Sequence, residues 1–239
     1  MKKTCLIVFV LSLMTLSSQT KGKITYRVTL NIDSLEQPFE DPKNTDIQND
    51  VLLMLHESEP IDGHLIFNDS ISRYSVDPDA ESRLNNDFLF KHGAVNFLYF
   101  MAGGNSTFYN DWSRNYSISQ NSILGTTKRI LREPLEWTFT NETKEIDGYL
   151  CYLATLDKSK SDTKLKVWYN SKIPVKHGPA GYSGLPGLVM EIEDKIYIWK
   201  VTEIDFDSEE ADDIIEPTEG DLITAEEFRE LAGNPFGKN

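Results

Sequence analysis

A dense run of glycine and proline between residues 178 and 187 constrains the fold of this chain more than any other feature. It reads Gly178-Pro179-Ala180-Gly181-Tyr182-Ser183-Gly184-Leu185-Pro186-Gly187 and leads directly into the apolar pair Leu188-Val189. Glycine permits positive φ angles, whereas proline fixes φ near about −65° and removes a hydrogen-bond donor. The backbone must therefore follow one particular path here, and the run predicts a loop of specified shape in front of a strand.

Strands are predicted on both sides of this loop, because apolar and polar residues alternate with a period of two. The clearest ranges are 24–32, 136–140, 148–156, 163–170, 188–193 and 196–204. The last two predict a hairpin, and Asp147-Gly148 predicts a tight turn. An extended run is predicted over 63–76, a strand buried on both faces over 97–101, and short strands around 107–109 and 116–118.

Helices are expected at only two places. Residues 47–56 have apolar spacings that suit a short helix, and Thr224-Ala225-Glu226-Glu227 forms a capping box that leads into a helix ending near Leu231. Many short strands with little helix predict a mainly β protein. We expect a strongly curved antiparallel sheet or half-open β-barrel with one or two short helices.

The two ends of the chain have their own character. Residues 1–20 begin with Lys2 and Lys3, continue into an apolar run and close on small residues, which is the pattern of a secretory signal peptide. Residues 205–239 are strongly acidic and indicate a solvated tail that carries the short C-terminal helix. The predicted organisation is a signal peptide over 1–20, a β domain over 21–204 and the acidic tail over 205–239.

Charge and motif spacing disfavour several classes of function. The formal charge of −14 repels phosphate backbones, so nucleic-acid binding is not expected. The glycine run contains no lysine and precedes a strand, which is unlike a phosphate-binding loop. The four histidines are not at metal-ligand spacing, and we predict neither a metal nor a cofactor. No segment after residue 20 is apolar for long enough to cross a bilayer, so an integral membrane protein is not expected.

Two side chains remain as candidates for chemistry. Cys151 lies in a predicted strand and is interpreted as a buried structural thiol, and it would be the one cysteine left after removal of residues 1–20. His177 borders the glycine run and is interpreted as an imidazole bonded within the loop. A Cys151–His177 nucleophile pair is left open, although nothing local supports it.

Aromatic residues gather in the predicted strands around the glycine run. They are Trp137, Trp168, Tyr169, Tyr197 and Trp199. Ordinary core packing is one interpretation. The other is an aromatic-lined concave pocket, which half-open barrels offer to apolar ligands.

The segment that runs from Trp168-Tyr169-Asn170 through Ile173-Pro174-Val175 to the glycine run resembles the GLPGLI family, also called Porph_ging. The family motif is Gly-Leu-Pro-Gly-Leu-Ile, and this chain has Val189 in the last place. The resemblance also includes Trp137 and residues 145–151, and it covers about residues 126–204. The motif positions are Gly178, Pro179, Gly184, Leu185, Pro186, Gly187, Leu188 and Val189.

What the resemblance implies is export and a β-rich domain, because the family consists of secreted proteins found mainly in Bacteroidota. It implies a location in the periplasm or at the cell surface of a Gram-negative bacterium. The family has no established activity, so it supplies no catalytic residues. The leading hypothesis is a non-enzymatic envelope protein that binds an apolar ligand or acyl chain in the half-barrel. The alternatives are a protein-interaction module that docks on an envelope partner through the acidic tail and C-terminal helix, and a hydrolase.

Overall fold

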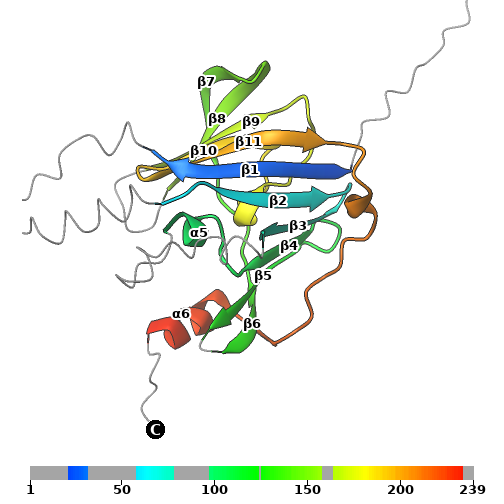
Figure 1. The fold of residues 1–239 in the computed structure, drawn as a ribbon, viewed down its shortest axis with the longest axis vertical. Coiled ribbons are helices and arrows are strands. Elements are labelled where there is room, and N and C mark those ends of the chain that lie inside the picture. The colour runs from blue at the N-terminus through cyan, green and yellow to red at the C-terminus, as the bar shows by residue number, and fades with distance from the viewer. Residues whose placement is uncertain (1–20, 32–57, 78–96, 124, 158–163, 234–239) are drawn as a thin grey trace, which may run out of the picture.

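The structure is a computed structural model that describes residues 21–31, 58–77, 97–123, 125–157 and 164–233. The predicted signal peptide and the predicted helix over 47–56 lie outside these residues. Within the described ranges, twelve strands form one sheet that does not close into a barrel (Figure 1). The mainly β prediction is therefore confirmed.

The strands are joined in a simple order. They are β1 (Gly22–Leu30), β2 (Ile61–Phe67), β3 (Ile71–Val76), β4 (Thr107–Asp111), β5 (Tyr116–Ile123), β6 (Thr126–Leu131), β7 (Thr138–Ile146), β8 (Tyr149–Asp157), β9 (Lys164–Asn170), β10 (Leu188–Glu193), β11 (Tyr197–Asp205) and β12 (Asp221–Ile223). From β1 to β6 the chain builds an antiparallel meander in one direction. It then restarts at the far edge with β7 and returns strand by strand until β11 pairs with β1.

The connection between β6 and β7 shows how strongly the sheet curves. Only residues 132–137 join the two strands, and an extended chain spans at most about 3.5 Å per residue, or roughly 25 Å here. In a flat sheet with strands about 4.8 Å apart, β6 and β7 would be roughly 48 Å apart. The sheet must therefore curl until its two halves face each other, as the sequence predicts.

Two local expectations are wrong. The run Phe97–Met101 is a short helix, α5, and not a strand. Its turn is closed by hydrogen bonds from Ala102 N to Leu98 O and from Gly104 N to Tyr99 O, both 2.8 Å. A five-residue apolar run is too short for its period to separate strand from helix. The extended run over 63–76 is likewise two strands, because the Asn68 side chain accepts a hydrogen bond from Ile71 N and closes a turn.

Other expectations are confirmed by backbone geometry. Asp147 and Gly148 have positive φ angles of 48° and 82° and form the tight turn between β7 and β8. The hairpin of β10 and β11 forms as predicted. Thr224 caps helix α6 (Ala225–Gly233), since its hydroxyl accepts from Glu227 N while Glu227 accepts from Thr224 N.

The acidic C-terminal segment lies along the sheet. Its carboxylates are largely exposed, as the sequence indicates, but its backbone is attached at several points. Ala211 is buried in a short 3₁₀ turn, η2 (Glu209–Asp212), and Lys21 and Lys23 pair with Asp212 and Glu210. Further along, β12 adds to β6 in parallel.

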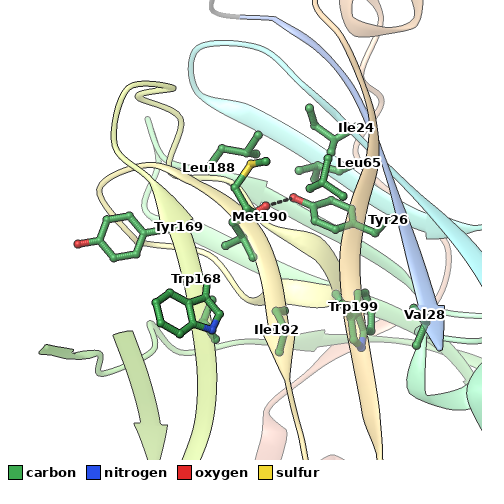
Figure 2. Close-up of a cluster of buried hydrophobic side chains, with 14 of the residues drawn as sticks. Ile24, Tyr26, Val28, Leu65, Trp168, Tyr169, Leu188, Met190, Ile192 and Trp199 are labelled. Carbon is green, nitrogen blue, oxygen red and sulfur yellow. Dashed lines mark hydrogen bonds between the residues drawn. The ribbon is translucent and has the colours of Figure 1, made fainter. Parts of the chain in front are cut away.

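The core lies between the two halves of the curved sheet. Figure 2 shows side chains from β1, β2, β9, β10 and β11 meeting there. Tyr26 and Trp199 are fully buried, and the Tyr26 hydroxyl donates a hydrogen bond of 2.8 Å to the Val189 carbonyl. This bond joins the first strand to the end of the glycine-rich motif. In the described part of the chain, no helix combines the length and apolar character needed to cross a membrane.

Candidate functional site

The segment between β9 and β10, residues 171–187, is called the motif loop below. It leaves the β7–β11 half of the sheet, and its short 3₁₀ turn, η1 (Pro179–Gly181), contacts β2, β3 and β4 in the other half. Leu185, Leu188 and Val189 are buried in the core. The motif therefore fills space between the two halves of the sheet that a half-barrel would otherwise leave open.

Two motif glycines are required by close backbone contacts. A Cβ on Gly178 would lie 1.8 Å from the Tyr182 carbonyl oxygen, and a Cβ on Gly187 would lie 2.2 Å from the Asn170 carbonyl oxygen. Neither contact can be relieved by turning a side chain, because both partners are backbone atoms. Trp137 also fixes the loop, since its Nε1 donates a hydrogen bond of 3.0 Å to Ser183 O.

His177 connects the motif loop to the turn between β2 and β3. Its side chain is 1% exposed, and its Nε2 donates to the Asn68 carbonyl at 3.0 Å. Its Nδ1 is buried and has no hydrogen-bond partner among the residues that the structure describes. Burial lowers the pKa of His177 to about 4, so the imidazole is neutral near pH 7.

Cys151 is buried in β8, and its Sγ donates to the Tyr149 carbonyl at 3.4 Å. Burial raises the pKa of the Cys151 thiol to about 11, so the nucleophilic thiolate is scarce near pH 7. No contact among the described residues joins Cys151 to His177. The structure does not bring the two candidates for chemistry together.

The five aromatic candidates lie in different surroundings. Trp168, Tyr169, Tyr197 and Trp199 belong to the buried core cluster, whereas Trp137 is partly buried and packs against it. Neither of the two cavities described below is lined by any of the five.

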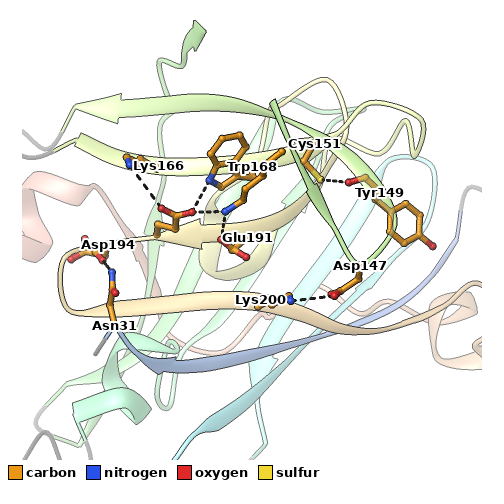
Figure 3. Close-up of polar contacts among 11 residues, drawn as sticks. Asn31, Asp147, Tyr149, Cys151, Lys166, Trp168, Glu191, Asp194 and Lys200 are labelled. Atoms are coloured by element: carbon orange, nitrogen blue, oxygen red, sulfur yellow. Dashed lines mark hydrogen bonds and ion pairs between the residues drawn. The ribbon is translucent and has the colours of Figure 1, made fainter. Parts of the chain in front are cut away.

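Trp168 also takes part in a polar cluster on β7, β9 and β10 (Figure 3). Its Nε1 donates a hydrogen bond of 2.8 Å to Glu193, and Lys144 lies 4.4 Å from its ring centre. Lys144 also pairs with Glu191 and Glu193. Burial raises the pKa of Glu191. Burial acts in the same direction on Glu193, but hydrogen bonds from Lys144 and Trp168 outweigh it and lower that pKa. Lys166 also lies 4.0 Å from Glu193, so two lysines face two glutamates in this cluster. No group of acidic, histidine or cysteine residues suited to a metal ion occurs in the described residues.

A polar cavity of about 170 Å³ lies against the motif loop. The loop contributes Gly181, Ser183 and Gly184, and the 132–137 linker contributes Arg132. Its other polar walls come from β4, β5 and the turn between them. They include Asn110, Asp111, Trp112 and Ser117. Asp111 is already paired with Arg114, whereas Trp112 Nε1 is buried and has no hydrogen-bond partner in the described part of the chain.

A second cavity, of about 410 Å³, lies between helix α6 and strands β4–β6 and is called the α6 groove below. Its apolar walls are Phe108, Ile130, Leu131 and Phe228. The polar lining consists of two serines, Asn121, Arg132, Glu133 and Arg229. The groove is thus apolar on several sides and bounded by the C-terminal helix.

Arg132 lines both the polar cavity and the α6 groove. Its guanidinium carbon lies 5.3 Å from the Phe108 ring centre, and a Cβ on Gly181 would lie 2.7 Å from its Nε. The guanidinium therefore lies beside one lining residue of each cavity, Phe108 of the α6 groove and Gly181 of the polar cavity. Sequence reasoning missed Arg132, Phe108 and Phe228, because a residue in a six-residue linker carries no periodic signal and its neighbours are distant in the sequence.

Comparison with known proteins gives a family match to part of the chain and a likeness in fold. Residues 157–191 match a family model described as "Protein of unknown function (Porph_ging)". No curated protein matches the chain in sequence. Two solved structures of PNGF-II are similar in fold, one in space group C2 (TM-score 0.50, 13% identity) and one in P21 (TM-score 0.49, 14% identity).

Both alignments cover 89% of this chain but only 32% and 33% of PNGF-II, so the chain spans about a third of the length of those proteins. At this identity the likeness concerns the fold alone. The family match contains the whole motif loop and the first four residues of β10. The resemblance to the GLPGLI family, Porph_ging, is therefore confirmed over residues 157–191.

Proposed function

We propose that this protein is an exported, non-enzymatic binding protein of the cell envelope that holds an apolar ligand or acyl chain in the α6 groove. The observation that carries the proposal is the groove itself. Its volume of about 410 Å³ is within the range of about 300–1,000 Å³ that is typical of small-molecule pockets. Phe108, Ile130, Leu131 and Phe228 supply apolar surface on both the sheet and the helix side.

This site differs from the one that the sequence suggests. The half-barrel interior is occupied by the motif loop and by core aromatics such as Trp199, which is fully buried. An acyl chain there would have to displace packed core side chains. The α6 groove needs no such displacement, and one of its walls is a terminal helix with few contacts to the sheet.

We assign this protein no catalytic role because of the states of its two candidate side chains, Cys151 and His177. The Cys151 thiol is protonated near pH 7, and the His177 imidazole is held against a backbone carbonyl. A nucleophile needs a base within hydrogen-bond reach. Neither residue has such a partner among the described residues.

The test compares two substitutions on α6. Phe228 lines the groove, whereas Leu231 is 49% exposed on the same helix and does not line it. We expect Phe228→Ser to reduce uptake of a fluorescent fatty acid strongly and Leu231→Ser to leave it unchanged. Native mass spectrometry of the protein purified from its own envelope should also reveal a co-purifying lipid. A lipid-free mass together with no uptake by the unmodified protein would refute the proposal.

A docking module is the second candidate, because large apolar side chains of the C-terminal segment are exposed. Ile215, Leu222 and Leu231 are 62%, 44% and 49% exposed. Replacing all three with serine should abolish association with an envelope partner without opening the core. If every envelope association of the protein survives this triple substitution, the docking proposal fails.

A further inference from the structure

We propose that Arg132 anchors the headgroup of the ligand, and that the ligand class is a long-chain carboxylate with its chain in the α6 groove. This inference rests on the proposed function. It adds a charged headgroup to the proposed ligand and names Arg132 as the residue that binds this headgroup.

Within the part of the chain that the structure describes, Arg132 has no anionic partner. No side-chain hydrogen bond or ion pair of its guanidinium occurs among the described residues. Arg27 and Arg114 differ, since each donates to a carboxylate, Arg27 to Asp62 and Arg114 to Asp111. Those two arginines are about half exposed. Arg129 and Arg229 donate to backbone carbonyls, and of the arginines without a carboxylate partner among the described residues, Arg132 is the one that lines both cavities.

The charge of Arg132 lies in a partly buried environment. Arg132 is half-buried between Phe108 and the backbone of Gly181. Burial lowers the pKa of Arg132, and the Tyr182 hydroxyl is the one group that opposes this shift. Arginine nevertheless stays charged in proteins. A charge that is taken out of water without a partner is unfavourable, and an incoming anion would offset that penalty.

Arg132 also lies where the two cavities meet. Arg132 lines the apolar groove and the polar cavity together, so an amphiphile can place its chain in one and its headgroup at the boundary with the other. Ser117 and Asn110 provide further polar groups in the polar cavity. Arg229 also lines the groove, but it lies on the exposed face of α6, and its Nε donates to the Ala225 carbonyl.

The charge balance selects a singly charged headgroup. Besides Arg132, the polar cavity is lined by two acidic residues, Asp111 and Glu133. Asp111 shares Arg114 with Glu216, and Glu133 is exposed, forms no ion pair with Arg132 and lines the α6 groove as well. A doubly charged phosphate would meet this negative wall at close range. A carboxylate carries one charge, and its two oxygens match the planar fork of the guanidinium.

The experiment measures binding of dodecanoate, dodecanol and dodecyl phosphate by isothermal titration calorimetry. We expect dodecanoate to bind about 10-fold to 100-fold more tightly than dodecanol, which is the range for a hydrogen bond to a charged group. In Arg132→Gln this preference should disappear while dodecanol binding is retained, and Arg132→Lys should keep part of it. Arg27→Gln is the matched control and should keep the whole preference.

The outcomes separate the two proposals. If the unmodified protein binds neither dodecanoate nor dodecanol, the proposed function itself fails. If it binds both equally, the groove remains and the role of Arg132 is refuted. Tighter binding of dodecyl phosphate would overturn the carboxylate class. If Arg132→Gln does not fold, methyl dodecanoate replaces the variant, because the neutral ester should bind the unmodified protein as weakly as dodecanol.

Discussion

His177 should make this protein less stable as the solution becomes acidic. Its ring is buried, and burial lowers its pKa from 6.5 to about 4. Below about pH 6.5 the unfolded chain binds a proton at this position, but the folded protein does not until about pH 4. The unfolded state is therefore favoured increasingly as the pH falls. The free energy of unfolding should decrease by about 1.4 kcal/mol per pH unit, or roughly 3 kcal/mol over the whole interval.

The assay is urea unfolding of the unmodified protein and of His177→Gln at about pH 7.5 and about pH 5. Glutamine does not titrate, so the stability difference between the two proteins should shrink by about 2 kcal/mol at the lower pH. His64→Gln is the matched control. His64 is half-buried and its pKa is also lowered, mainly by burial, so its effect should have the same sign and a smaller size. If the curves for the unmodified protein and His177→Gln run parallel across this range, the reasoning about the buried neutral imidazole is refuted.

Two further predictions concern the motif and the thiol. Gly178→Ala should lower the free energy of unfolding by about 3 kcal/mol, because the new Cβ meets the Tyr182 carbonyl. Gly125→Ala should cost only about 1 kcal/mol, because that site has open space and merely a positive φ; equal losses in chemical denaturation would contradict this. In a Cys5→Ser background, Cys151 should react with a thiol reagent near neutral pH only after unfolding, and immediate labelling of the native protein would show the thiol to be accessible.

The sequence predicts strands well where one face of the strand is buried. In β3 the alternation survives in the structure, because buried and half-buried residues alternate along the whole strand. In β10 it survives only in the second half, because Leu188, Val189 and Met190 are all buried. It fails for α5, where five apolar residues fit either period and the two glycines that follow decide the outcome. The turn at Asn68 was missed because it depends on a side-chain oxygen that bonds to the backbone.

The candidate site was less predictable than the fold. The motif loop is visible in the sequence because proline and glycine mark it, and the resemblance to a family depends on the same residues. The α6 groove is not visible, because it joins Phe108 to Phe228 across more than half of the chain. Arg132 lies beside both cavities only because the linker that contains it crosses between the two halves of the sheet. No local sequence pattern predicts this position.

The pairing of β1 with β11 has a consequence for the order of folding. Lys23 pairs with Asp205 and Leu30 with Tyr197, so the middle of the sheet joins residues that are 182 and 167 positions apart in the sequence. Folds with contacts this distant in sequence form slowly, over about milliseconds to seconds. Until β11 has been synthesised, β1 has one open edge with unpaired N–H and C=O groups, which is a template for association with other chains. A chain that stops before Tyr197 should therefore aggregate rather than accumulate as a smaller folded domain.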